Sequence, residues 1–384
     1  MKIAILTLPL HTNYGGILQA YALQEYLKQQ GHSSEVILLQ IYSRPTYRIW
    51  LSLFKSLILT VLGKGNERKV LKELKNRYHQ RHVSKYIDMF IRDYIHFSPS
   101  VQSIEKLQEL ANNRYDAFIV GSDQVWRRKY MTSLPVEYFF LDFVPENVIK
   151  IAFSASFGCD EVEYDSSEIN KCGQAYSRLN FISVRELSGI PLIREELKWH
   201  NSHTECEHIF DPTFLLSKDF YIQQFNLKKP NSDYKILFSY LLEECIAGDS
   251  VLNYVPNGYN IMKTESSDIY FNDKHSDVMM SPKDWLETIY RSAAIITDSF
   301  HCCVFSIIFQ RPFLVILNAV RGNSRLESLL ITFEMQNRIL YHPAELETKN
   351  YLLSGYSQQE LNKINGTISF HQNKSASFLR QALI

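Results

Sequence analysis

The sequence has few cysteines, and none lies in a pattern that indicates metal binding or a disulfide scaffold. Six cysteines occur in 384 residues, without any C-x-x-C pair. Free, mostly buried thiols in a reducing compartment are therefore expected. The opening MKIAILTLPL has one lysine and no cleavage site of small residues behind it, so we interpret it as a β-strand rather than a signal peptide. These features predict a cytoplasmic protein.

The sequence also lacks an excess of charge of one sign, because 41 basic and 41 acidic residues cancel. This balance argues against a general nucleic-acid binder. Common ligand motifs are missing as well: there is no Walker A loop, no glycine-rich dinucleotide loop, no H-E-x-x-H and no D-x-D. We therefore expect no metal site and no cofactor.

What is present is the composition of a globular protein, with 45% apolar and 21% charged residues. The length favours two domains, and the best linker signal is a Lys-Lys-Pro-Asn-Ser cluster at 228–232. The predicted organisation is a first domain over 1–230 with a basic helical insertion at about 41–100, a second domain over 231–345, and a helical tail over 346–384 that packs back on the first domain.

A strand–helix–strand rhythm runs along the chain. The apolar run 3–8 precedes a polar loop at 11–16, a segment of helical spacing at 17–27 and a second apolar run at 35–39. Similar runs recur at 115–121, 149–153, 181–184, 234–240, 293–297 and 312–317. Continuous apolar runs are typical of parallel strands buried on both faces. The pattern predicts an α/β protein with doubly wound sheets.

The segment 41–100 interrupts this rhythm. Eleven basic residues stand against three acidic ones between 41 and 90, and the apolar stretch 49–62 contains Lys55 and is too short to span a bilayer. Two interpretations remain open. The segment either contacts the inner membrane face or a lipid-linked acceptor on the acceptor side of the site, or it packs on the first domain as a helical hairpin with a solvated basic face.

Polar clusters follow several of the predicted strands, where open α/β sheets bind ligands. Asn13-Tyr14-Gly15-Gly16 offers backbone N–H groups at a helix start to an anion or a sugar; a tight turn explains its glycines equally well. Ser122-Asp123-Gln124-Val125-Trp126 follows the strand 117–120, and Asp123 suits the binding or deprotonation of hydroxyls. Helix capping is the alternative. Arg185, after the strand 181–184, either binds an anion or pairs with a nearby carboxylate.

The strongest cluster follows the strand 293–296. Thr297-Asp298-Ser299-Phe300-His301 places a histidine in the first turn of a helix capped by Asp298 or Ser299. Such a histidine suits a general acid or base, whereas a structural histidine is the alternative. Arg321 and Arg325 follow the strand 313–317 beside a glycine and small polar residues, a composition that suits a phosphate or carboxylate. Solvated surface arginines are the other interpretation.

In this order the clusters resemble the polysaccharide pyruvyl transferase family. The matching segments are KIAILTLPLHTNYGGILQAYAL, YDAFIVGSDQVW, KIAFSASFG, SVRE, DPTFLL, TDSFHCCVFSIIFQRPFLVI and RGNSRLESLL. The resemblance implies a fold similar to GT-B glycosyltransferases, with two Rossmann-like domains and the active site in the cleft between them. It also implies phosphoenolpyruvate as donor, and a cyclic ketal on a sugar, such as a 4,6-ketal on galactose, in a surface polysaccharide precursor.

The resemblance carries the family's catalytic histidine over to His301. Some members have an arginine shortly before that histidine, where this sequence has Asp298, Ser299 and Phe300, so the donor phosphate falls to other arginines. The expected catalytic residues are His301 and Asp123, the donor-binding residues Arg321, Arg325, Arg185 and Ser299, and the acceptor-binding residues Asn13, Tyr14, Gly15, Ser122, Gln124 and Trp126. The acceptor is a sugar or a lipid-linked oligosaccharide. The alternatives are a nucleotide-sugar glycosyltransferase and a non-catalytic carbohydrate-binding protein on the same fold.

Overall fold

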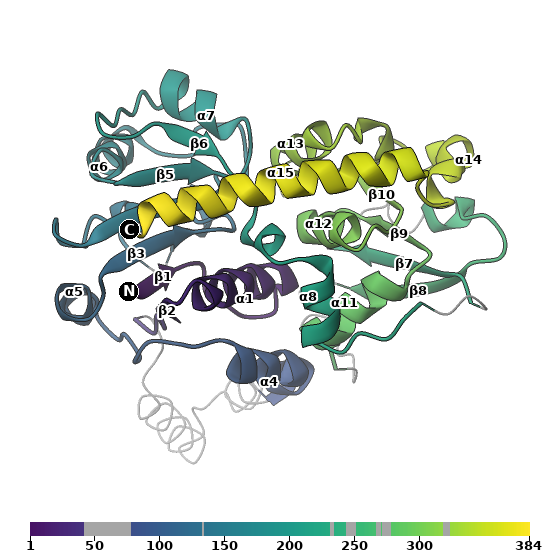
Figure 1. Cartoon of the computed structure of the whole chain (residues 1–384), viewed down its shortest axis with the longest axis horizontal. Helices are drawn as coiled ribbons and strands as arrows, with labels where there is room; N and C mark the ends of the chain where they lie inside the picture. The colour runs from purple at the N-terminus through teal and green to yellow at the C-terminus, as the bar shows by residue number, and fades with distance from the viewer. Residues whose placement is uncertain are drawn as a thin grey trace, which may run out of the picture.

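A computed structural model describes residues 1–41, 78–132, 134–230, 234–242, 251–265, 270, 278–317 and 323–384. The predicted apolar stretch at 49–62 lies outside these residues. Two separate parallel sheets form the framework, and helices surround both of them (Figure 1). The predicted α/β class with two Rossmann-like sheets is confirmed. The boundary near residue 230 stays a prediction.

The first sheet has six strands in the order β2-β1-β3-β4-β5-β6, and every neighbouring pair is parallel. Ile3 and Ile5 of β1 pack into one hydrophobic cluster, whereas Ala4 and Leu6 pack into the cluster on the opposite face. Burial on both faces explains why the strand sequence is a continuous apolar run. The strands are β1 (Lys2–Leu6), β2 (Ser33–Val36), β3 (Ala117–Gly121), β4 (Ile149–Ala155), β5 (Phe181–Val184) and β6 (Cys206–His208).

The second sheet has five parallel strands in the order β11-β10-β9-β7-β8. Its strands are β7 (Ile236–Leu241), β8 (Asn260–Glu265), β9 (Ala294–Thr297), β10 (Phe313–Ile316) and β11 (Ile339–Leu340). The described helices are α1 (Tyr14–Gln29), α4 (Lys85–Tyr94), α5 (Ile104–Asn113), α6 (Ser166–Tyr176), α7 (Gly189–Pro191), α8 (Lys218–Gln224), α11 (Pro282–Arg291), α12 (Phe300–Ile308), α13 (Ser324–Thr332), α14 (Glu345–Lys349) and α15 (Gln358–Ala382). Short helical turns lie at Arg128–Tyr130, Val136–Phe140, Leu192–Glu196, Pro212–Leu215, Leu252–Tyr254, Gln336–Arg338 and Asn350–Leu353.

Each sheet has one point where the strand order reverses direction. In the first sheet β1 lies between β2 and β3, so the loops after β1 and β3 leave neighbouring strand ends in opposite directions. In the second sheet β7 and β9 are neighbours in the same way. Open α/β sheets bind ligands at the carboxyl ends of the strands beside such a point. Asn13 and Asp123 belong to the first of these loop pairs, and His301 follows β9 in the second.

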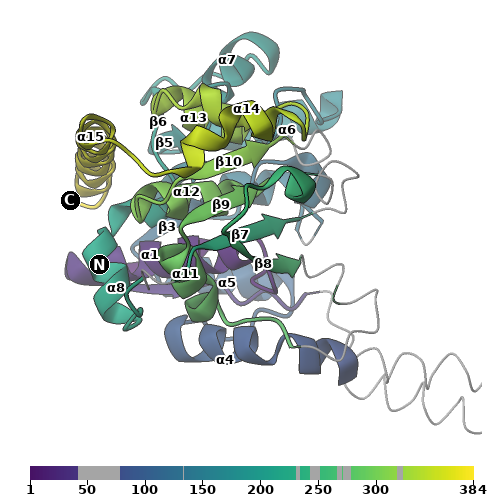
Figure 2. The same cartoon turned by 90° about the vertical axis from the view of Figure 1, so that its right-hand side faces the viewer.

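The C-terminal helix α15 bridges the two halves. Figure 1 shows it running along both sheets, and Figure 2 shows it nearly end-on at one side of the molecule. Phe378 contacts the rings of Phe153 in β4 and Phe181 in β5, whereas Asn365 accepts a hydrogen bond from Gln310, at the end of α12. One helix therefore fixes the first sheet relative to the second. None of the described helices is long and apolar enough to cross a membrane.

Candidate functional site

The loop after β3 is built so that Asp123 projects from the sheet edge. Gly121 has φ 142°, and a Cβ on it would lie 2.0 Å from the carbonyl oxygen of Phe153, so only glycine fits there. Asp123 itself has φ 56°, a left-handed conformation that is strained for a residue with a side chain. Its Oδ2 lies 3.5 Å from the Asn13 amide nitrogen, which approaches from the start of α1.

His301 lies in the first turn of α12, as the sequence predicts. Ser299 caps this helix, because its Oγ accepts a hydrogen bond from the backbone N–H of Cys302. Asp298 does not cap it, since its Oδ1 accepts from the backbone N–H of Leu242 at 2.7 Å and so ties the loops after β7 and β9 together. The His301 ring is buried and faces the first sheet.

Gly15 makes room for the His301 ring. A Cβ on Gly15 would lie 1.9 Å from His301 Nδ1. Gly15 does not have a positive φ, so close approach is the reason for glycine at this position, rather than the tight turn that the sequence also allows. Helix α1 of the first sheet and helix α12 of the second thus meet at this ring, and an active-site cleft between the two halves stays a prediction.

Asp211 connects His301 to the first sheet. His301 Nε2 lies 3.3 Å from Asp211 Oδ2, and the same oxygen accepts hydrogen bonds from Arg185 Nη1 at 2.9 Å and from Ser122 Oγ at 2.9 Å. The backbone N–H and hydroxyl of Thr213 donate to Oδ1. Both oxygens of this buried carboxylate therefore have protein partners.

The electrostatics of Asp211 follow from these contacts. Burial alone would raise the pKa of the carboxyl, but the charge and hydrogen bond of His301, the charge of Arg185 and the backbone of Thr213 outweigh it, so the pKa is held well below its usual value. Asp211 is therefore ionised at neutral pH. It joins a histidine of one half to an arginine of the other.

Two arginines converge beside this network. The Arg185 guanidinium lies 4.4 Å and the Arg325 guanidinium 5.8 Å from the ring centroid of Phe300. Burial, followed by the charge of Arg185, lowers the pKa of Arg325 to about 10. Arg185 Nη2 is 4.0 Å from Asp123 Oδ1, and its buried Nε and Nη2 have no hydrogen-bond partner among the described residues. Together with Ser328, the arginines line a small pocket. Two neighbouring desolvated cations, with unused donors on Arg185, suit an anion.

The structure separates the predicted site residues into three groups. His301, Asp123, Asn13, Arg185 and Arg325 are brought together around Asp211 and Phe300. Gly15, Ser122 and Ser299 support this group by making room for His301, by bonding to Asp211 and by capping α12. Tyr14, Gln124 and Trp126 form the third group, considered next. Arg321 lies outside the described residues, so its role as a donor-binding residue stays a prediction.

Three predicted acceptor-binding residues have other partners. Trp126 is fully buried, stacks on Phe140 and donates from Nε1 to the Phe139 carbonyl. Tyr14 is also buried and donates to the Met280 carbonyl. The amide oxygen of Gln124 accepts from Arg127 Nη1 at 2.9 Å. The Tyr14 and Trp126 side chains are enclosed by other residues in this conformation, and their role as acceptor-binding residues stays a prediction.

Sequence reasoning missed the role of Asp211. Its segment, Asp-Pro-Thr directly after β6, contributes to the family resemblance, but nothing in its composition shows that the carboxylate contacts residues 122, 185 and 301. The available signal was an acidic residue at the end of a strand before Pro, which is the pattern of a helix cap, and Asp211 does cap the turn Pro212–Leu215. No group of residues suited to a metal ion occurs within the described part of the chain.

One known protein family matches most of this sequence. The sequence model described as "Polysaccharide pyruvyl transferase" matches residues 13–319, a span that contains every residue of the network described above except Arg325. The chain belongs to the polysaccharide pyruvyl transferase family. This membership confirms the resemblance and implies an enzyme that uses a pyruvyl donor and a sugar acceptor. No curated protein is significantly similar to the chain.

Solved structures share the fold of this pyruvyl transferase family member. A UDP-GlcNAc 2-epimerase from Neisseria meningitidis bound to UDP-GlcNAc has a TM-score of 0.52 at 11% identity, covering 99% of this chain and 100% of that one. A putative UDP-N-acetylglucosamine 2-epimerase from Listeria monocytogenes has a TM-score of 0.52 at 11% identity, with coverages of 95% and 90%. The glycotransferase of kitacinnamycin has a TM-score of 0.51 at 9% identity, with coverages of 99% and 97%. The predicted GT-B-like fold is confirmed.

Proposed function

We propose that this enzyme transfers the pyruvyl group of phosphoenolpyruvate to two hydroxyls of one sugar, forming a cyclic ketal. The observation that carries the proposal is the network His301–Asp211–Arg185, which joins the two halves beside a second buried arginine, Arg325. A proton donor next to two desolvated cations meets the demands of an enol phosphate, whose reaction needs carbon protonation and stabilisation of two anionic groups.

The donor is assigned to the arginines. Phosphoenolpyruvate carries a phosphate and a carboxylate, and Arg185 and Arg325 offer two guanidinium groups near the same ring, Phe300. An anion between them would offset the burial and the repulsion that lower the pKa of Arg325. Some family members have an arginine shortly before the catalytic histidine, where this chain has the helix cap Ser299. In this chain the second positive charge therefore comes from Arg325 of α13. Arg321 remains a further candidate.

His301 is assigned as the general acid. Its proton passes to the methylene carbon of the donor, which becomes a methyl group, and the central carbon becomes oxocarbenium-like. One sugar hydroxyl attacks this carbon, the bond to phosphate breaks, and a second hydroxyl closes the ring. The two hydroxyls lose two protons in total. One replaces the proton that His301 gave to the methyl group, and the other leaves with the released phosphate. Asp211 orients the imidazole through Nε2, so His301 Nδ1 faces the start of α1.

The acceptor is assigned to the first sheet. The buried Asp123 carboxylate and the exposed Asn13 amide lie 3.5 Å apart at Oδ2 and Nδ2, and these groups suit sugar hydroxyls. Asp123 is the candidate base for the attacking hydroxyl. We propose a hexose of a surface polysaccharide precursor as acceptor, with a 4,6-ketal on galactose as the first case to test.

The experiment incubates the protein with phosphoenolpyruvate and a panel of hexosides, oligosaccharides and lipid-linked sugars, followed by mass spectrometry. The expected product carries one added pyruvyl unit with loss of water, together with released phosphate. A parallel panel replaces phosphoenolpyruvate with nucleotide sugars. Glycosyl transfer from a nucleotide sugar without any pyruvyl transfer would overturn the proposal in favour of a glycosyltransferase, and no turnover with any donor would favour a binding protein.

A further inference from the structure

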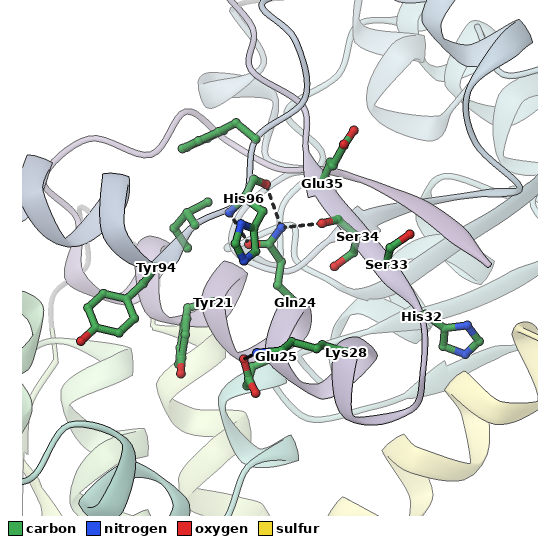
Figure 3. A pocket seen from close by; sticks show the side chains of 12 residues that line it. Tyr21, Gln24, Glu25, Lys28, His32, Ser33, Ser34, Glu35, Tyr94 and His96 are labelled. Carbon is green, nitrogen blue, oxygen red and sulfur yellow. Dashed lines mark hydrogen bonds and ion pairs between the residues drawn. The ribbon is translucent and has the colours of Figure 1, made fainter.

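A second cavity lies on the first sheet, apart from the catalytic network. Its volume is about 520 Å³, within the range of roughly 300–1,000 Å³ that is typical of small-molecule sites. It is bounded by the second half of α1, by the beginning of the edge strand β2 and by the residues that follow α4 (Figure 3). None of its lining residues belongs to the network around Asp211, and the proposed reaction does not use them.

The floor of this cavity is held rigidly by Gln24. Its Nε2 donates to the carbonyl oxygens of Ser34 at 3.2 Å and His96 at 2.8 Å, and its Oε1 accepts from the backbone N–H of His96 at 3.1 Å. Figure 3 shows this side chain reaching from α1 to both segments. The buried amide thus fixes three separate elements around the cavity, so the cavity is formed without a ligand.

The charged side chains at the rim largely neutralise one another. Glu35 accepts two hydrogen bonds from Arg114, at 3.0 and 2.7 Å, and one from the Tyr115 hydroxyl. Glu25 lies 3.4 Å from Lys28. The remaining lining consists of Ile95, Gln24, serines, histidines and aromatic residues, and it includes Ser33, Ser34, His32, His96, Tyr21 and Tyr94. A lining of this kind offers no uncompensated charge that could pair with a strongly charged ligand. It favours a neutral ligand with many hydroxyls.

One wall of the cavity is aromatic and firmly packed. Tyr21 and Tyr94 lie 5.9 Å apart between ring centroids, and both contact Phe90 and Phe225. Because Tyr21 is only 2% exposed, the half-buried Tyr94 is the tyrosine that can offer a ring to a ligand. An aromatic ring together with hydroxyl and imidazole groups matches a sugar ring, which has an apolar face and a rim of hydroxyls. We propose that this cavity binds one sugar unit of an oligosaccharide.

The position of the cavity gives this site a role distinct from catalysis. Gly15 contacts His301 at the start of α1, and the cavity residues Tyr21 to Lys28 follow six to thirteen residues later, about 9–20 Å along the helix at about 1.5 Å per residue. A polymeric acceptor held here has a higher effective concentration at the catalytic cleft. This role rests on the proposed function, because it assumes that the acceptor is a saccharide chain.

The test measures sugar binding without phosphoenolpyruvate. Galactotetraose, maltotetraose and xylotetraose are titrated separately into the full-length protein by calorimetry. The variants are Ser33→Trp, which fills the cavity from an exposed edge position, and His96→Ala, which removes an exposed lining ring. Ser202→Trp, at an exposed bend away from the cavity, is the matched control. At least one oligosaccharide should bind, with an affinity about tenfold weaker in the cavity variants and unchanged in Ser202→Trp.

Equal affinity in the wild-type protein and both cavity variants would overturn the assignment, as would the absence of binding for all three oligosaccharides. In turnover assays the cavity variants should raise KM for an oligosaccharide acceptor and leave kcat, and KM for a monosaccharide acceptor, unchanged. Failure of the two proposals is distinguishable. Loss of oligosaccharide binding in a protein that still transfers pyruvate removes only this site, whereas oligosaccharide binding without transfer removes only the proposed reaction.

Discussion

Asp211 is the residue on which the proposed site depends most. Its side chain is fully buried, and the ion-paired Arg185 side chain is only 1% exposed. A buried carboxylate of this kind is stabilised by its donors, so removal of its charge leaves Arg185 with only the more distant carboxylate of Asp123, at 4.0 Å. The same carboxylate fixes the orientation of His301. Asp211 is therefore a positioning residue whose loss should affect both folding and turnover.

Asp211→Asn should lower the free energy of unfolding by about 3–5 kcal/mol at neutral pH, because it removes the closer of the two carboxylates that compensate the buried Arg185. It should also lower kcat by about 10²-fold, as expected when a catalytic group loses its orientation. Denaturant unfolding and initial rates with phosphoenolpyruvate measure the two effects. Unchanged kcat in a folded Asp211→Asn protein would show that Asp211 does not position His301.

The pH dependence of the free energy of unfolding, compared between the wild-type protein and Asp211→Asn, gives a separate check. The pKa of Asp211 is depressed in the folded protein, so its stabilising contribution is fully present above its unfolded pKa of about 3.9 and is lost as the pH falls towards the folded value. The difference in unfolding free energy between wild type and Asp211→Asn should stay constant from pH 7 to about pH 5 and shrink below about pH 4. A difference that grows on acidification would contradict this electrostatic role.

Gly15→Ala tests the close approach of α1 to His301. The new Cβ would lie 1.9 Å from Nδ1, a distance at which either the ring or the helix must move. We expect kcat to fall by about 10²-fold. Gly366→Ala is the matched control, since Gly366 lies within α15 and nothing is within 4 Å of the added Cβ. This control should leave kcat unchanged and should leave the free energy of unfolding unchanged or slightly higher. Equal rates in both variants would show that the His301 ring is not confined by α1.

At the scale of elements, the sequence allowed most strands and site-bearing loops to be predicted. Strands β1, β3, β4, β5, β7, β9 and β10 were expected, because each is an apolar run. The expected second strand, 35–39, begins and ends earlier in the structure, as Ser33–Val36, and its first residues are polar because they lie at a sheet edge. The short strands β6 and β11 and the mostly exposed β8 carry no such run, so hydrophobic periodicity does not reveal them.

Helix α15 contacts both halves, and Phe378 is the α15 residue that packs on strands β4 and β5 of the first sheet. Phe378→Ala should lower the free energy of unfolding by about 3–5 kcal/mol, because it removes a buried ring from between Phe153 and Phe181. The matched control is Phe370→Ala on the same helix, whose ring is 64% exposed; its effect should be within about 0.5 kcal/mol. Comparable losses in denaturant unfolding of the two variants would contradict this role of α15.

At the scale of the whole molecule, the site is assembled from parts far apart in the sequence. Asn13, Asp123, Arg185 and Asp211 come from one half, and His301 and Arg325 from the other. The sequence predicted most of these residues individually, because polar side chains at strand ends are a local signal. It did not predict Asp211 as their common partner or Gly15 as the space for a ring, because both depend on how the two sheets approach each other. It also assigned Trp126 to the site, since a conspicuous aromatic after a strand gives no sign of which way it points.

The central claim is that His301 delivers a proton to the methylene carbon of phosphoenolpyruvate during ketal formation. The most direct measurement is the reaction in heavy water, with the product re-equilibrated in ordinary water and analysed by mass spectrometry. The ketal methyl group should retain a single deuterium, and His301→Asn should abolish or strongly slow its formation while phosphoenolpyruvate still binds. A product that keeps the methylene group, or a His301→Asn protein that forms the deuterated ketal at the wild-type rate, would contradict the claim.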